Sequence, residues 1–167
     1  VWGEYGNWGL DHSKAESLGI FMPEWMEAVE RDYNSPALIG WCPFNETWDI
    51  NGHQQDNNVL KSIYLLTKAM DKSRPVIDTS GHYHVMTDIY DIHDYTQNAE
   101  LFKEHYAPMV EGGEVYDNFP KRQSHQGQPY FISEYGGIRW NPKSDEGWGY
   151  GDAPKTVEEF VERYCSL

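Results

Sequence analysis

The sequence predicts an α/β fold with a mostly parallel sheet, and three observations support this. Short apolar runs alternate with amphipathic helical patterns along the chain. The clearest run, residues 37–42, is continuously apolar, as expected of a strand that is buried on both faces. Polar residues gather where the apolar runs end. Strands that alternate with helices in this way are typical of a parallel sheet with crossover helices.

The N-terminal half contains two predicted strands and two predicted helices. Residues 1–5 are expected to form the end of a strand, and a glycine-rich loop follows. Pro23 suits the first turn of a helix, and apolar residues then recur at spacings of three and four. Residues 34–36 end this helix, because the residue before a proline avoids helical geometry. After the strand at 37–42, the same spacing predicts a second helix over residues 59–70.

The C-terminal half contains the remaining elements. Short strands are predicted over residues 75–78, 88–93 and 130–133, with a helical and irregular stretch over residues 98–127. Thr156 and the glutamate three residues later form a capping box that begins the last helix. The predicted order is therefore β, α, β, α, β, β, α, β, α.

Composition excludes several classes of function. The 167 residues contain 13 Lys and Arg against 27 Asp and Glu, a formal net charge of −14, which opposes binding to nucleic acid or to an anionic membrane. No apolar run approaches the roughly 20 residues of a membrane span. Cys42 and Cys165 make no disulfide framework and favour a reducing, cytoplasmic compartment. Aromatic residues make up 15% of the chain, which suits either a packed core or a surface that binds sugar rings.

Two glutamates follow predicted strands and suggest a chemistry. Active sites of parallel α/β folds lie at the carboxyl ends of the strands, where Glu46 and Glu134 are expected. A pair of carboxyl groups about 5–5.5 Å apart can hydrolyse a glycoside, one as acid and the other as nucleophile. Taken singly, Glu46 is also explained as a cap of the next helix, and Glu134 as part of a turn.

Two segments resemble glycoside hydrolase family 2, which contains β-galactosidases, β-glucuronidases and β-mannosidases. Residues 31–41 running into Phe44-Asn45-Glu46 resemble its helix-three to strand-four segment, and residues 128–137 resemble its strand-seven segment. The resemblance implies a retaining mechanism with Glu46 as acid/base and Glu134 as nucleophile. It also implies that Asn45 binds the sugar 2-hydroxyl.

The resemblance also implies the extent of the fold. It aligns the chain with a (β/α)₈ TIM barrel from about strand three to helix seven. Residues 1–167 would then be a fragment of one catalytic barrel domain, without strands one, two and eight and without the N-terminal β-domains. Because such a fragment has open sheet edges, we expect it to associate with the remainder of the parent enzyme or with itself as a homo-oligomer. The mechanism requires no cofactor.

The resemblance suggests further substrate contacts. Tyr95 lies where the family places a tyrosine near the nucleophile, so it is expected to hydrogen-bond Glu134. His93 lies where the family often has asparagine, and it departs from the pattern. Glu4 matches an acidic residue after strand three and is expected either to contact sugar hydroxyls or to form a salt bridge.

Two further groups of residues are candidates for the pocket. His82 is expected to line it, although His82 and His84, with His93 and Asp94, also have residue types that bind metals. We expect these residues either to line the sugar pocket or to form hydrogen bonds within the loops, and we assign no metal. The tryptophans in predicted strand-end loops are candidate sugar platforms: Trp8, Trp48, Trp140 and Trp148.

The sequence thus predicts a retaining β-glycosidase, with a β-galactoside as the leading substrate. One alternative is an endo-β-glycanase of the same clan. Another is a non-catalytic barrel fragment that binds carbohydrate, for which sugar binding survives loss of both Glu46 and Glu134.

Overall fold

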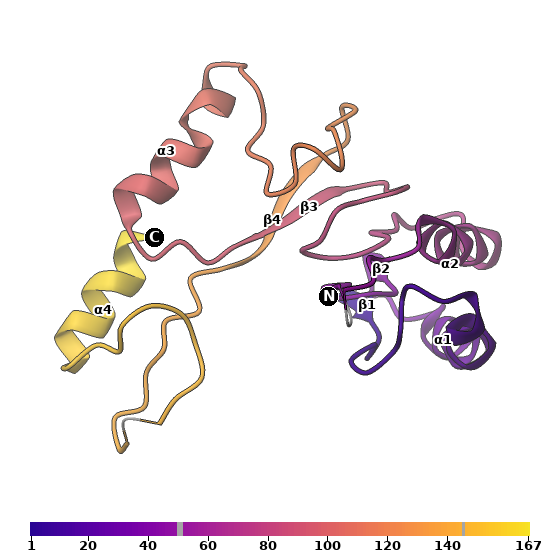
Figure 1. The fold of residues 1–167 in the computed structure, drawn as a ribbon, viewed down its shortest axis with the longest axis horizontal. Helices are drawn as coiled ribbons and strands as arrows, with labels where there is room; N and C mark the ends of the chain where they lie inside the picture. Colours follow the sequence, from indigo (N-terminus) through magenta and orange to yellow (C-terminus); the bar gives the residue numbers. More distant parts are fainter. Residues whose placement is uncertain (50–51, 145) are drawn as a thin grey trace. The chain divides into compact units, whose positions relative to one another are not determined.

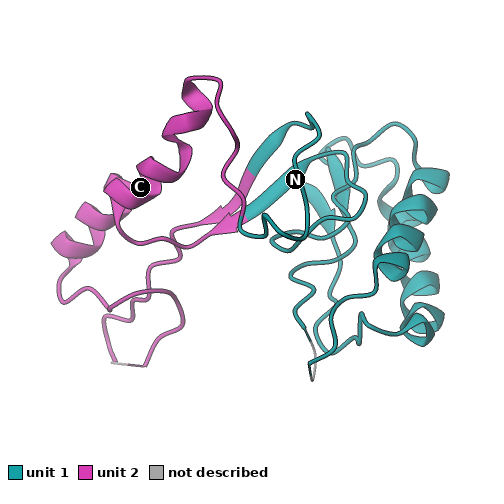
Figure 2. Ribbon diagram, turned by 45° about the horizontal axis from the view of Figure 1, so that its top comes forward, with its two compact units in different colours: residues 1–92, 118–131 teal, residues 93–117, 132–167 magenta. Residues whose placement is uncertain are grey.

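The structure is a computed structural model that describes residues 1–49, 52–144 and 146–167. Figure 2 shows that the chain forms two compact units. Unit 1 contains residues 1–92 and 118–131, and unit 2 contains residues 93–117 and 132–167.

Unit 1 contains a short parallel sheet and two long helices (Figure 1). Its elements are β1 (Trp2–Glu4), the 3₁₀ helix η1 (Ala15–Ser17), α1 (Leu18–Asp32), β2 (Gly40–Cys42) and α2 (Asn57–Met70). β1 and β2 are parallel, with Trp2 opposite Gly40 and Glu4 opposite Cys42. Every residue of β2 is buried, as the continuously apolar run predicts.

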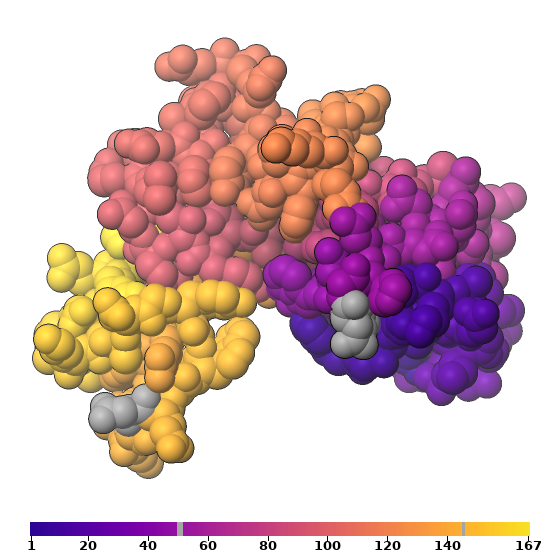
Figure 3. All heavy atoms as spheres, viewed as in Figure 1, coloured from indigo at the N-terminus to yellow at the C-terminus, as the bar shows by residue number. Residues whose placement is uncertain are grey.

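The core of unit 1 lies between its two helices and the sheet. Figure 3 shows the atoms of the α1 region, in indigo, packed directly against those of the α2 region, in purple. The indole Nε1 of Trp25 on α1 donates to Thr67 Oγ1 on α2 over 2.8 Å, so the helices share a buried hydrogen bond as well as apolar contact. The buried core residues are Phe21, Trp25, Ala28, Val29, Trp41, Phe44, Val59, Leu60, Ile63 and Val76.

The first helix begins earlier than the sequence predicts. It starts at Leu18, so the prediction that Pro23 opens the helix is wrong, and Pro23 lies inside α1. A proline in this position removes one intrahelical hydrogen bond. The extra turn is retained because it carries Phe21, which is buried against Phe44 with ring centroids 4.6 Å apart.

The strand predicted over residues 75–78 is reduced to a single bridge. Val76 forms an isolated parallel bridge with Trp41. Pro75 has no N–H to donate, and the N–H of Val76 is occupied by the Asp88 carboxylate at 2.9 Å. On the side of β2, Trp41 N donates to Pro75 O at 3.0 Å and Ile77 N donates to Trp41 O at 2.9 Å, which forms the bridge. On the other side, Val76 is bonded to Asp88, whose N–H also donates to Val76 O at 2.9 Å.

A buried ionic cluster joins the end of α2 to the sheet. Asp71 is fully buried and accepts from Trp41 Nε1 at 2.9 Å and from Arg74 at 2.7 Å. Burial alone would raise the pKa of the Asp71 carboxyl, but hydrogen bonds from Ser73, Trp41 and Arg74 hold it well below its usual range. Asp71 is therefore an ionised group that is stabilised by these donors.

Unit 2 is built on parts of two strands and on two helices. The elements are β3 (Tyr90–Asp94), α3 (Ala99–Val110), β4 (Tyr130–Tyr135) and α4 (Val157–Ser166), with the first residues of both strands in unit 1. β3 and β4 pair as a two-stranded sheet. β3 begins at Tyr90, later than predicted, and both strands end later than predicted, at Asp94 and Tyr135. Thr156 caps α4 by accepting from the N–H of Glu159, so this half of the predicted capping box is confirmed. The Glu159 carboxylate accepts from Lys155 N, one residue before the expected partner.

The fold is mixed α/β, as predicted. Among the described residues, the paired strands form two separate two-stranded sheets and no closed barrel. None of the helices in the described ranges has the length and apolar character that crossing a membrane requires.

Candidate active site

The Asn45–Glu46 dipeptide follows the end of β2 in unit 1. Glu46 N donates to Ser80 O at 2.8 Å, and Asn45 forms a parallel bridge with Ser80. Glu46 has φ = +49°, and among the described residues it is the one non-glycine residue with positive φ. Side chains rarely adopt this conformation, and residues held in it cluster at functional sites. The Glu46 carboxylate accepts from Trp48 Nε1 at 3.2 Å.

Asn45 carries an unused acceptor. Its Oδ1 is buried and, within the described ranges, has no hydrogen-bond partner. A buried unpaired carbonyl is unfavourable unless a ligand or water donates to it. The arrangement is therefore suited to bind a hydroxyl group.

The Asn45 backbone is held by Asn7, a residue that the sequence analysis did not select. Asn45 N donates to Asn7 Oδ1 at 2.8 Å, and Asn7 Nδ2 donates to Asn45 O at 2.9 Å. Asn7 lies in the loop that was predicted only as glycine-rich. Nothing in the local pattern identifies a partner 38 positions away.

His82 is buried close to the Glu46 loop. Its Nδ1 lies 2.9 Å from Gln55 Oε1, and its ring centroid lies 5.7 Å from that of Trp48. Burial lowers the pKa of His82 to about 4, against a smaller opposing effect of the Asp49 charge. His82 is therefore neutral near pH 7, and its role in substrate binding remains a prediction.

His84 belongs to a different buried network of unit 1. Its Nδ1 lies 2.7 Å from Asp78, and its Nε2 lies 2.8 Å from the backbone oxygen of Asp91. Burial lowers the pKa of His84, but the Asp78 charge and hydrogen bond outweigh it and raise the pKa. His82 faces Gln55 while His84 faces Asp78, and among the described residues neither belongs to a group of side chains that could hold a metal ion.

Glu134 lies on β4 in unit 2, beside His93 on β3 and Tyr95 directly after β3. The Tyr95 hydroxyl donates to Glu134 Oε2, so the predicted hydrogen bond is present. His93 Nε2 lies 3.4 Å from Glu134 Oε1, and His93 Nδ1 lies 3.4 Å from the Tyr95 hydroxyl. His93 is buried, whereas 38% of the Glu134 side chain is exposed. The carboxylate is thus oriented by two partners and remains accessible.

Asp94 and Tyr95, at the end of β3, are held by contacts with other residues of unit 2. The Tyr95 ring stacks on Tyr150, with centroids 3.8 Å apart and planes 10° apart. Asp94 accepts from His105 at 2.8 Å and from Tyr106 at 2.9 Å, both on α3. Burial would raise the pKa of Asp94, but these and other hydrogen bonds lower it. Asp94 therefore anchors β3 to α3.

The remaining predicted residues differ in exposure. Glu4 is exposed at the end of β1 and accepts from Trp2 Nε1 at 3.1 Å. Trp48 is 47% exposed. Trp140 is half-buried and stacks on Phe160 of α4, with ring centroids 4.5 Å apart. Their contacts with sugar remain predictions.

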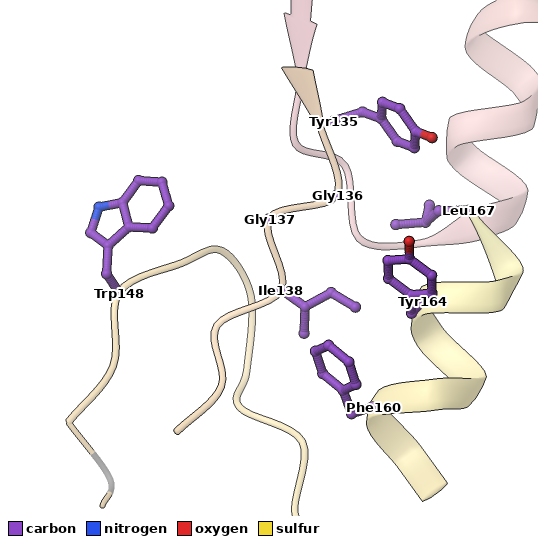
Figure 4. Close-up of a pocket in the computed structure, with 8 residues that line it drawn as sticks. All are labelled: Tyr135, Gly136, Gly137, Ile138, Trp148, Phe160, Tyr164 and Leu167. Atoms are coloured by element: carbon purple, nitrogen blue, oxygen red, sulfur yellow. The ribbon is translucent and has the colours of Figure 1, made fainter. Parts of the chain in front are cut away.

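Unit 2 also contains an apolar pocket beyond β4, with a volume of about 510 Å³. Figure 4 shows aromatic side chains from β4, α4 and the intervening loop around it. The lining residues are Tyr135, Gly136, Gly137, Ile138, Trp148, Phe160, Tyr164 and Leu167.

A family model matches nearly the whole chain. The family model described as "Glycosyl hydrolases family 2, TIM barrel domain" matches residues 4–162 of the 167-residue chain. No curated protein matches the chain.

Proposed function

The chain belongs to the TIM barrel domain family of the family 2 glycosyl hydrolases, and from this premise we propose that it is catalytic and acts on β-linked glycosides with retention. Glu134 is the nucleophile and Glu46 is the acid/base. The observation that carries the proposal is the Tyr95–Glu134–His93 arrangement, in which an accessible carboxylate is oriented by two partners.

The surroundings of Glu134 suit a nucleophile. Attack on an anomeric carbon requires an ionised carboxylate with one oxygen directed at the sugar. A phenol that donates to the carboxylate fixes its orientation. Tyr95 supplies that donor and is itself held by stacking on Tyr150.

The surroundings of Glu46 suit proton transfer. Its backbone is held in a left-handed conformation that fixes the origin of the side chain, and Trp48 contacts the carboxyl group. The adjacent Asn45 presents a buried acceptor that no other described residue satisfies, and a sugar hydroxyl would satisfy it. Acid and hydroxyl acceptor thus come from consecutive residues.

The reaction then proceeds in two displacements. The Glu134 carboxylate forms a bond to the anomeric carbon while the glycosidic bond breaks, and the Glu46 carboxylic acid protonates the leaving oxygen. Glu46, now ionised, takes a proton from water, and that water displaces Glu134 from the glycosyl ester. Two inversions give net retention, and Glu46 is reprotonated for the next cycle.

The finer assignments rest on the family resemblance. We propose a β-galactoside as the leading substrate, and a partial barrel from strand three to helix seven as the fold that carries the site. A screen of aryl β-glycosides against the full-length protein tests the substrate.

Substitution of Glu134 tests the nucleophile. Glu134→Ala in the full-length protein should abolish turnover, and azide should restore it with a product of inverted configuration. The exposed Glu111→Ala serves as a matched control and should retain activity. Full activity of Glu134→Ala, or sugar binding without turnover by the unmodified protein, contradicts the proposal.

Substitution of Glu46 tests the acid. Glu46→Ala should slow substrates with poor leaving groups about 10²–10⁴-fold, whereas activated aryl glycosides need little acid assistance. Equal slowing of both substrate types contradicts this role.

A further inference from the structure

The Asn7 side chain continues the sheet where β1 ends. β1 pairs with β2 only as far as Glu4 and Cys42. Three residues beyond Glu4, the Asn7 carboxamide forms both a donor and an acceptor hydrogen bond with the backbone of Asn45, at 2.9 and 2.8 Å. One side chain thus satisfies the N–H and the C=O that a neighbouring strand would otherwise satisfy.

The same segment is held by Ser80. Ser80 N donates to Phe44 O at 2.8 Å, and Glu46 N donates to Ser80 O at 2.8 Å. The backbone over residues 44–46 is therefore bonded both to Asn7 and to Ser80, immediately before and at the residue with φ = +49°. An unfavourable conformation persists only where its surroundings fix it strongly.

His12 in turn fixes the orientation of Asn7. Asn7 Nδ2 lies 3.0 Å from His12 Nε2, and an amide nitrogen only donates, so His12 Nε2 accepts. Asn7 is 2% exposed and His12 is 4% exposed. The His12 ring contacts Phe44 edge-on, with centroids 5.3 Å apart, and its backbone oxygen accepts from Asp56 N at the start of α2. The carboxamide of Asn7 is thus held in a fixed orientation within the core of unit 1.

We infer that Asn7 is a positioning residue for the Asn45–Glu46 dipeptide. It fixes the backbone that carries both the side chain of Asn45, the hydroxyl acceptor, and the side chain of Glu46, the acid/base. Asn7 therefore acts through that backbone. This inference rests on the proposed function, in which Glu46 transfers the proton.

Kinetics on two substrates test the inference in the full-length protein. Asn7→Ala should lower kcat for a glycoside with a poor leaving group at least tenfold, lower it much less for an activated aryl glycoside, and change KM little. The matched control is Thr67→Val, which removes a buried hydroxyl hydrogen-bonded to Trp25 in the same unit. It should affect both substrates equally. If Asn7→Ala lowers kcat equally for both substrates, or for neither of them, the inference is wrong.

Amide hydrogen exchange provides a test that does not depend on activity. In Asn7→Ala, the Asn45 amide should exchange at least tenfold faster, while the Ser80 amide keeps its protection. Unchanged protection of Asn45, or equal acceleration at Asn45 and Ser80, overturns the inference. The kinetics of Glu46→Ala separate failure of this inference from failure of the proposed function. If Glu46→Ala slows substrates with poor and good leaving groups equally, the proposed function fails, whatever the exchange result.

Discussion

The phenolic hydroxyl of Tyr95 donates a hydrogen bond to the carboxylate of Glu134. Tyr95 follows β3 and Glu134 lies on β4, so pairing of these strands brings together residues 39 positions apart. Because the acceptor is the carboxylate that we assign as nucleophile, this hydrogen bond bears directly on catalysis.

The first prediction concerns this hydrogen bond. Tyr95→Phe should lower kcat/KM about 10–100-fold, because a hydrogen bond to a charged group contributes roughly 1.5–3 kcal/mol. Steady-state kinetics measure the effect. Tyr164→Phe, which removes a hydroxyl from a 70% exposed ring of the same unit, should leave kcat/KM unchanged. Unchanged kinetics in Tyr95→Phe would show that the bond has no catalytic role.

The second prediction concerns the unpaired acceptor of Asn45. Asn45→Ala should lower kcat/KM about 10–100-fold on a normal sugar but much less on its 2-deoxy analogue, where one hydroxyl donor is missing. The free energy of unfolding should change by less than about 1 kcal/mol, because Oδ1 has no hydrogen bond to lose among the residues that the structure describes. Equal losses on both substrates would exclude the 2-hydroxyl as its ligand.

The third prediction concerns the buried ionic cluster at Asp71. Asp71→Ala should lower the free energy of unfolding by about 3 kcal/mol or more, since it leaves the Trp41 N–H and the Arg74 charge without their acceptor. Urea denaturation gives the value. The control is Asp32→Ala, which breaks a surface pair with side chains 37% and 72% exposed, and it should cost at most about 1 kcal/mol. A loss at Asp71 no larger than the control's would refute the prediction.

The fourth prediction concerns pH. The pKa of His82 is about 4 in the folded chain and about 6.5 when unfolded, so the unfolded state binds the extra proton between these values. The contribution of His82 to the free energy of unfolding is therefore complete at neutral pH and is lost as the pH falls from about 6.5 to 4. It should remove about 2 kcal/mol of stability between pH 7 and pH 5.

Denaturation of variants isolates this effect. Between pH 7 and pH 5, the free energy of unfolding of His82→Gln should fall by about 2 kcal/mol less than that of the unmodified protein. His53→Gln, at an exposed histidine, should behave like the unmodified protein. The same pH dependence in all three proteins would contradict the assignment to His82.

Local pattern predicted the elements and the positions of the two glutamates. The buried strand β2, the helix over residues 59–70 and the Thr156 cap depend on neighbouring residues, so the sequence reveals them. The family motif added the Tyr95–Glu134 hydrogen bond, which spacing alone does not indicate.

Errors arose where contacts with distant residues decide the local structure. The predicted strand at 75–78 forms one bridge to Trp41, and on its other side Val76 bonds to Asp88 through both its N–H and its C=O. Burial of Phe21 extends α1 ahead of Pro23. Asn7 was missed for a related reason. Its partner is the backbone of Asn45, and because every residue has the same backbone groups, the sequence does not indicate this partner.

The distance between the carboxyl groups of Glu46 and Glu134 tests the central claim most directly. A crystal structure of the full-length protein measures it. We expect about 5–5.5 Å, which leaves room for one anomeric carbon between a nucleophile and an acid. A separation of about 6.5–9.5 Å would indicate an inverting enzyme, and carboxyl groups that do not face a common cavity would contradict the assignment of this pair.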